Sequence, residues 1–213
     1  MNCVCGQGFS VEHALSCKTG GYSIMRHNSI RDTIAGMLGE VLKDVSTEPM
    51  LTPLSGETFH RKATTIDPEA RADVAARGFW SKGVKMFADV RVFNPLAPSY
   101  RSSSQKALYQ RFDNEKKNKY AERIIQIERG TFTPLVFSTL GGYGKEAERF
   151  MKRLIELHTN KKEDIHSKIA NLIRTKISFC ILRATILCIR GARTVKHQQY
   201  EPMDVDIHKA QQE

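Results

Sequence analysis

KMFADVRVF, residues 85–93, is the stretch that decides the fold of this chain. Its β-branched and aromatic residues, its period of two and the Asn-Pro stop that follows predict a β-strand. Alternation along a strand places Asp89 and Arg91 on one face and the two valines beside them on the other, toward a core. An acidic residue inside an otherwise apolar strand is costly unless something binds it, so Asp89 is the first candidate functional residue.

The segments around this strand predict a mixed α/β domain. The expected order is a helix over residues 28–43 with Asn28 as its N-cap, an extended piece over 45–50, strands over 71–76, 85–93, 123–128 and 134–138, and helices over 104–122, 144–157 and 165–195. The helices follow from apolar residues at helical spacing, and the strands from short runs bounded by turn residues. A central mixed β-sheet flanked by helices on both sides buries all of these apolar faces.

Composition divides the chain into three units. Residues 1–22 are rich in Cys, Gly and His, residues 26–195 carry the α/β pattern and end in a strongly apolar helix, and residues 197–213 are polar, weakly patterned and expected to be disordered. The most apolar stretch, residues 177–189, is expected to form a buried helix. It is too short to span a bilayer and contains an arginine, so no membrane association is expected.

The 213 residues carry a formal net charge of +10 and five cysteines. Residues 201–213 contain four acids and one lysine, which leaves +13 on the rest of the chain. A basic body predicts a polyanionic partner, with nucleic acid the commonest kind, although a basic surface that only maintains solubility is the alternative. An odd cysteine count, with three bunched at one end, argues against a disulfide framework, so a reducing nuclear or cytoplasmic setting is expected.

The first unit contains the spacing Cys3-x-Cys5-x7-His13-x3-Cys17. Zinc takes four Cys or His ligands in a tetrahedron, and two intervening glycines supply the turn that lets nearby cysteines share one ion. One helical turn aims His13 and Cys17 at the same point. The pattern predicts a structural zinc knuckle. The alternative is three unconnected reduced cysteines and a surface histidine. His27 is a replacement ligand or, more simply, a helix cap or substrate contact.

Asp73 and Asp89 form the second candidate site. Asp73 lies in the expected strand 71–76, and a turn at Gly83 makes a hairpin that brings it alongside Asp89. Hydrolysis of a phosphodiester needs charge neutralisation and an activated water, and Mg²⁺ held by carboxylates supplies both. Arg91, two residues beyond Asp89, shares its strand face. A buried ion pair between Asp89 and Arg91, with no chemistry, is the alternative.

Five short motifs follow one another along the chain: Arg26-His27-Asn28, Glu48-Pro49, Arg71-Ala72-Asp73, Asp89-Val90-Arg91-Val92 and Lys116-x3-Tyr120. Their order resembles the restriction-enzyme-like endonuclease at the C-terminal end of site-specific non-LTR retrotransposon proteins, a member of the PD-(D/E)XK superfamily. In those proteins the nuclease follows a CCHC zinc knuckle, which is the place that the Cys and His residues of the first unit take here. The resemblance covers about residues 3–140 and implies a restriction-endonuclease-like fold.

The resemblance implies a role for each matching residue. Asp73 and Asp89 are the ligands of a catalytic Mg²⁺ or Mn²⁺ ion. Lys116 and Tyr120, one helical turn apart, face the scissile phosphate. Arg91 stands where the family has Lys or Gln. Because an arginine keeps its proton, it stabilises charge and does not act as a base, so water activation falls to metal and carboxylate, or a lysine is supplied from elsewhere, such as Lys116.

Three further positions bear on this resemblance. Ala72 replaces the proline of the PD pair, which is tolerable because that proline only shapes the backbone. Glu40 on the first helix is a candidate additional acid, with a plain surface glutamate as the simpler interpretation. Glu128 at the end of an expected strand is another candidate, with a strand-end salt bridge as the simpler interpretation.

These observations predict a metal-dependent endonuclease that nicks duplex DNA, derived from a retrotransposon-type mobile element. The absence of a reverse transcriptase region before the knuckle suggests a fragment or a domesticated remnant of such an element. The principal alternative is a catalytically inactive nucleic-acid-binding remnant that keeps the fold and the basic surface. A third hypothesis is a zinc-stabilised protein-interaction domain, which differs in showing no salt-dependent affinity for DNA.

Overall fold

A computed structural model of the protein describes residues 2–192. The expected tail, residues 197–213, and the last residues of the expected final helix lie outside the described residues. Within the described part of the chain, no helix is long and apolar enough to cross a membrane.

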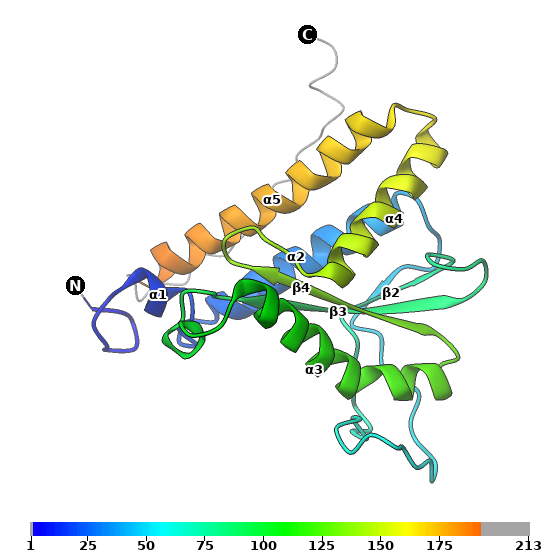
Figure 1. The fold of residues 1–213 in the computed structure, drawn as a ribbon, viewed down its shortest axis with the longest axis horizontal. Helices are drawn as coiled ribbons and strands as arrows, with labels where there is room; N and C mark the ends of the chain where they lie inside the picture. Colours follow the sequence, from blue (N-terminus) through cyan, green and yellow to red (C-terminus); the bar gives the residue numbers. More distant parts are fainter. Residues whose placement is uncertain (1, 193–213) are drawn as a thin grey trace.

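A four-stranded mixed sheet forms the centre of the molecule (Figure 1). Its strands are β1 (Ser46–Thr47), β2 (Val74–Arg77), β3 (Lys85–Phe93) and β4 (Thr131–Ser138), in that spatial order. The first two pairings are antiparallel, whereas β3 and β4 run parallel over the whole length of β3 from its second residue. Residues 85–93 therefore form a central strand with the predicted bounds.

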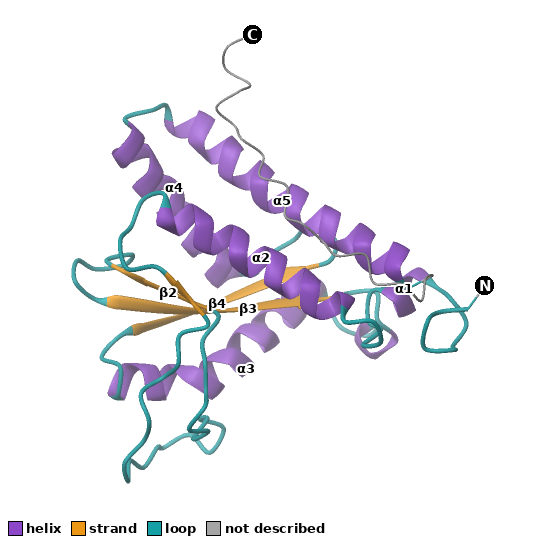
Figure 2. Ribbon diagram, turned by 180° about the vertical axis from the view of Figure 1, so that it is seen from behind, coloured by secondary structure: helices purple, strands orange, loops and turns teal. Residues whose placement is uncertain are grey.

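Helices cover both faces of this sheet, as predicted. The helical elements are α1 (Val11–Ala14), α2 (Tyr22–Gly39), the short 3-10 helix η1 (Pro98–Tyr100), α3 (Gln105–Gln126), α4 (Lys145–Lys162) and α5 (His166–Gly191). Figures 1 and 2 show α2, α4 and α5 on one side of the sheet and α3 on the other. The predicted α/β architecture is confirmed at this level.

Residues of β3 alternate between two cores. The large core between the sheet and α2, α4 and α5 takes Met86, Ala88 and Val90. The opposite face packs Phe87 and Phe93 against α3. This alternation confirms that Asp89 and Arg91 share the face toward α3, while their neighbouring valines point to the large core.

The apolar helix α5 buries one face only. Ile177 and Ile181 are 4% and 1% exposed, whereas Phe179, Leu182 and Ile186 on the outer side are 66%, 53% and 44% exposed. The expectation of a buried helix was wrong for this outer face, because α2 and α4 cover only the inner side.

The first long helix begins six residues earlier than predicted. Gly21, at a φ of 72°, turns the chain into α2 directly before Tyr22, and Asn28 lies inside the helix rather than at its N-cap. The helix also ends at Gly39 instead of residue 43. Tyr22 is buried against Cys188 of α5, and this distant partner extends the helix beyond the stripe visible in the sequence.

The predicted strand over residues 123–128 is wrong. α3 continues through this segment to Gln126, and a single strand, β4, replaces the two that were expected. Tyr120 and Ile124 are buried at a spacing of four and pack beneath the sheet, so a helix buries them better than a strand. The β-branched residues of the segment favoured a strand locally, and tertiary packing outweighs that preference.

Residues 48–73 form a long connection between β1 and β2, and Arg123 of α3 holds it in place. Arg123 is 0% exposed. Its guanidinium donates to the backbone oxygens of Thr52 at 3.0 Å, Asp67 at 2.6 Å and Thr65 at 3.3 Å. A charged group hydrogen-bonded to three carbonyls can replace the hydration that it loses on burial.

We expect Arg123→Met to lower the free energy of unfolding by about 3 kcal/mol, because three backbone carbonyl oxygens lose the charged donor that is buried among them. Denaturant unfolding measures the change, and limited proteolysis should detect new cleavage within residues 48–73. Lys106→Met, at an exposed position of the same helix, is the matched control and should change stability by no more than about 0.5 kcal/mol. Equal effects of the two substitutions would contradict the anchoring role.

Candidate functional site

Four potential metal ligands converge near the N-terminus. The Sγ atoms of Cys3 and Cys17 are 3.7 Å apart, and Sγ of Cys5 lies 3.1 Å from Nε2 of His13. All four ligand atoms lie within 4.8 Å of one another. A tetrahedral zinc ion with Zn–S bonds of about 2.3 Å holds its sulfur atoms about 3.8 Å apart. The predicted grouping is confirmed as a cluster that can hold a metal such as zinc.

Local backbone geometry builds this cluster. Gly6 has a φ of 86° and donates its N–H to Cys3 O at 2.9 Å, so the chain turns tightly between the first two cysteines. Ser10 caps α1 by accepting from His13 N at 3.1 Å, which fixes the direction of the histidine. Because α1 ends before Cys17, the expected single helical turn carries His13 alone, and the following turn delivers the last ligand.

The thiols of the cluster differ in acidity. Hydrogen bonding to the backbone at Gln7 lowers the pKa of Cys5 to about 7. Burial raises the pKa of Cys3. Zinc binds thiolates, so metal binding at this cluster releases protons and strengthens as the pH rises.

The N-terminal cluster packs on the rest of the protein. Val4 N donates to Ala192 O at the end of α5, at 2.9 Å, and Cys3 packs against the same alanine. Asn94, at the end of β3, donates its amide to Glu12 O at 3.1 Å. The first unit recognised in the sequence is therefore docked against two elements that are remote from it in the chain.

The second candidate site begins with Asp73, which immediately precedes β2. Its backbone N–H donates to Ala88 O at 3.0 Å. Its Oδ2 accepts from Val90 N at 2.6 Å and lies 3.0 Å from Nε2 of His27 on α2. Two elements, β3 and α2, thus fix the position of this residue and its carboxylate.

The site lies where two strands separate. β2 pairs with β3 only as far as Val74 and Ala88, so the next part of β3 has no strand partner on that side. At Val90 the carboxylate of Asp73 accepts from the free N–H, and His27 Nε2 lies 3.1 Å from the free carbonyl oxygen. Side chains therefore complete the hydrogen bonding of this strand edge.

The surroundings of His27 favour its protonated form. Burial lowers the pKa of His27, but the hydrogen bond and charge of Asp73 raise it by more, so the pKa is raised overall. Nδ1 of the ring lies 3.3 Å from Oδ1 of Asn28. An imidazolium has two N–H donors and can satisfy the acceptors on both sides.

Asp89 is a buried carboxylate paired with a lysine from α3. It is 4% exposed, and its Oδ2 lies 2.5 Å from Lys116 Nζ. The same oxygen accepts no well-directed hydrogen bond from any described residue. Burial raises the pKa of Asp89, Lys116 lowers it and Asp73 raises it, with a net upward shift. The two carboxylates therefore interact electrostatically.

Arg91 does not pair with Asp89, so the alternative of an internal ion pair on β3 was wrong. Its guanidinium donates to Glu115 at 2.7 Å and lies 3.8 Å from the centre of the Phe112 ring. Both partners belong to α3. Arg91 lies on the predicted face of β3 but is engaged with the neighbouring helix.

Tyr120 lies on the same helix as Lys116, and its ring is buried. It is 7% exposed, and its ring centre lies 5.6 Å from that of Phe132. Lys116 Nζ lies 5.9 Å and Lys119 Nζ 4.8 Å from the ring centre. Lys116 and Tyr120 therefore lie close together, as expected, and the tyrosine ring is buried beneath Lys116 and Lys119.

The two additional acidic candidates have structural partners. Glu40 pairs with Lys162 at 3.0 Å and Lys176 at 3.1 Å, and so links the end of α2 to α4 and α5. Glu128 follows α3 rather than a strand and accepts from Thr52 N at 2.6 Å. The contacts of Glu40 agree with its interpretation as a surface glutamate without a catalytic role. Glu128 does not form the expected strand-end salt bridge, because it follows a helix and binds a backbone N–H.

Within residues 2–192, the N-terminal cluster is the only group of three or more Cys, His, Asp or Glu ligands close enough to share a metal ion. Asp73 and Asp89 do not belong to such a group. A metal at these two carboxylates would take its remaining ligands from water or from a substrate, which is the usual situation of Mg²⁺.

A scan against protein-family models and a search of curated protein sequences each found no match to the chain.

Sequence reasoning missed the contact between His27 and Asp73. The signal was present, because His27, Ile30 and Ile34 have the spacing i, i+3, i+7 and therefore lie on one helix face. Placing the helix start at Asn28 left His27 outside this stripe. The pairing of Lys116 with Asp89 joins elements far apart in the chain, and no local pattern predicts it.

We expect the purified protein to retain one zinc ion per chain, because the four ligand atoms lie close enough together to share one ion. Cys17→Ser should reduce the retained zinc to less than about a tenth after dialysis, since one thiolate is lost. Elemental analysis measures the metal content. Cys180→Ser, which changes a cysteine of α5 outside the cluster, is the control and should keep the wild-type content. Equal zinc in the two variants would contradict the assignment.

Proposed function

We propose that this protein is a metal-dependent endonuclease of the PD-(D/E)XK type that nicks DNA, and that it derives from a retrotransposon-type mobile element. The observation that carries the proposal is the buried Asp89 carboxylate, which contacts Lys116, while the carboxylate of Asp73 accepts from the backbone N–H of the next residue, Val90. A mixed sheet flanked by helices and an adjacent Cys/His cluster agree with the resemblance of the motifs.

The residues fit a magnesium ion by their chemistry. Asp89 Oδ2 is a buried oxygen without a well-directed hydrogen bond, and Asp73 offers a second carboxylate nearby. Mg²⁺ prefers oxygen ligands and is usually held by one or two carboxylates together with waters and substrate phosphates. Asp73 and Asp89 would therefore hold the ion. A third protein ligand is not required, because water and substrate oxygens complete the coordination of Mg²⁺.

When bound, the ion supplies charge neutralisation at the phosphate and a water of lowered pKa. The protein's own residues have separate tasks. The Val90 N–H and the His27 ring orient the carboxylate of Asp73. Lys116 supplies positive charge beside Asp89 and stabilises negative charge that develops on the phosphate in the transition state.

We assign the lysine role of this site to Lys116 rather than to Arg91. Lys116 contacts Asp89 directly, whereas Arg91 is bound to Glu115 and stacked on Phe112. A lysine can also exchange its proton when its surroundings lower its pKa, which an arginine cannot do.

The second candidate function is an inactive DNA-binding module, and one observation favours it. The ammonium of Lys116 already neutralises Asp89 at 2.5 Å, so the carboxylate pair has a cation without any metal. Such a module would keep the basic surface, in line with the net charge of +10, and its affinity for DNA would fall steeply with salt.

We expect the protein to nick supercoiled plasmid in the presence of Mg²⁺ or Mn²⁺. Asp73→Asn and Asp89→Asn should each reduce the nicking rate at least about a hundredfold, because each removes a carboxylate from the metal site. Gel electrophoresis measures nicking, and fluorescence anisotropy should show that both variants still bind duplex DNA. Asp164→Asn, at the distant start of α5, is the control. Absence of nicking by the wild-type protein with either ion would favour the binding module.

Lys116→Gln should reduce the nicking rate by about a hundredfold, whereas Arg91→Gln should reduce it less than about tenfold. The difference follows from the contact of Lys116, and not of Arg91, with Asp89. Single-turnover rates of conversion of supercoiled plasmid to nicked circles measure the effect of each substitution. The reverse order of effects would return the charge-stabilising role to Arg91.

A further inference from the structure

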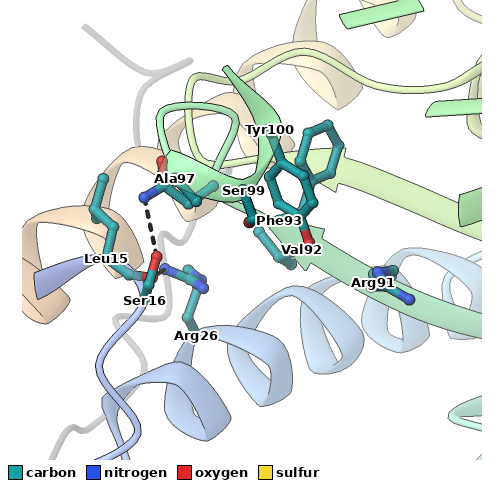
Figure 3. Close-up of a pocket in the computed structure, with 10 residues that line it drawn as sticks. Leu15, Ser16, Arg26, Arg91, Val92, Phe93, Ala97, Ser99 and Tyr100 are labelled. Atoms are coloured by element: carbon teal, nitrogen blue, oxygen red, sulfur yellow. Dashed lines mark hydrogen bonds between the residues drawn. The ribbon is translucent and has the colours of Figure 1, made fainter. Parts of the chain in front are cut away.

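A hollow of about 260 Å³ opens at the C-terminal end of β3, between the N-terminal cluster and η1 (Figure 3). Figure 3 shows side chains entering it from α2, from β3 and from the loop around η1. Its polar lining consists of Ser16, Arg26, Arg91, Asn94, Ser99 and Tyr100. No acidic residue lines it, and two of the lining residues are arginines.

Arg26 brings an uncompensated charge to this hollow. It is 5% exposed and donates only to Leu15 O at 3.0 Å and, weakly, to Cys188 Sγ at 3.6 Å. Its Nε has no hydrogen-bond partner, and no carboxylate of the described residues lies within ion-pair distance of it. A buried charge without a counter-ion costs several kcal/mol, and an anion in the hollow would offset that cost.

The rest of the hollow is suited to hold an anion in a fixed place. Arg91 lies on another side of it and keeps part of its guanidinium exposed, although one N–H is bound to Glu115. Asn94 donates to Ser16 Oγ and accepts from Leu96 N. These hydrogen bonds fix this side of the hollow, so it need not rearrange when an anion binds. The hydroxyl groups of the rim add neutral donors.

We propose that this hollow binds a backbone phosphate of the nucleic acid strand that crosses the carboxylate site. The inference rests on the proposed function for the identity of the anion. Arg91 lies two positions beyond Asp89 on β3, and Asn94 directly follows that strand, five positions beyond Asp89, which is about 7 to 17 Å at 3.3 Å per extended residue. With a rise of about 3.4 Å per nucleotide, the bound phosphate lies about two to five nucleotides from the bond at Asp89.

A charge series at Ser99 tests this subsite without disturbing the core, because Ser99 is exposed on the rim of the hollow. The variants are Ser99→Arg, Ser99→Asn and Ser99→Asp. Ser81→Asp, in the turn at the opposite end of β3, carries the same change in net charge and is the matched control. Fluorescence anisotropy measures the affinity of each full-length, zinc-loaded protein for a labelled duplex and for a labelled single strand, without Mg²⁺ and at several salt concentrations.

We expect affinity for the duplex to fall in the order Arg, Asn, Asp at position 99, with Ser99→Asp about tenfold weaker than Ser99→Asn. The slope of log affinity against log salt should decrease by about one for Ser99→Asp, since one phosphate contact is lost. Ser81→Asp should change affinity less than twofold. If Ser99→Asp and Ser81→Asp weaken binding equally, the effect is net charge and the subsite does not exist.

The outcome is independent of catalysis. A specific loss at Ser99 in a protein that never nicks DNA supports the subsite and refutes the endonuclease. Nicking that persists while Ser99→Asp binds as tightly as Ser99→Asn refutes the subsite and leaves the endonuclease standing. Inorganic phosphate that competes with the wild-type protein for DNA but not with Ser99→Asp supports the subsite as well.

Discussion

The energetics of this protein depend on one buried charge in its central strand. Asp89 lies in β3, which pairs with strands on both sides along its first half and with β4 along its length. Removing a carboxylate from water costs several kcal/mol unless a partner is supplied. The fold supplies Lys116 from α3 as that partner and places Asp73 nearby, which increases the cost. Such a concentration of like charge in a buried place is typical of sites shaped by function rather than by stability.

The geometry around Asp89 follows from where β2 ends. If the pairing of β2 with β3 continued beyond Ala88, backbone groups of β2 would form the hydrogen bonds of Val90, and no side chain would be needed there. Because the two strands part at Ala88, the edge of β3 must be completed by the side chains of Asp73 and His27. The arrangement of Asp73 and His27 is thus a consequence of sheet topology, and both side chains have a structural task.

Elements and sites could be predicted from the sequence where the residues that determine them lie close together in the chain. The bounds of β3 and the orientation of Asp89 were predictable, because alternation and the stop after Phe93 are local. The Cys/His cluster was predictable from ligand spacing. By contrast, the start of α2 depends on Tyr22 packing against α5, and the end of α3 depends on Ile124 packing beneath the sheet. These partners lie far away in the chain, and local preference pointed elsewhere.

Two buried arginines illustrate how the same residue type serves different ends. Arg123 directs its guanidinium to three carbonyl oxygens of residues 48–73 and so fixes the longest connection in the described chain. Arg26 has fewer partners and faces a hollow. The Nε atom of each arginine lacks a hydrogen-bond partner, and what distinguishes Arg26 is that it lines the hollow.

The contact between Val4 and Ala192 joins the first and last parts of the described chain. A zinc ion that orders the N-terminal turn also orders the surface on which the final turn of α5 rests. By reciprocity, any partner that stabilises that final turn raises the affinity for zinc by the same factor. Loss of a metal from the N-terminal cluster should therefore be felt as fraying of the final turn of α5, although about 190 positions separate the two along the backbone.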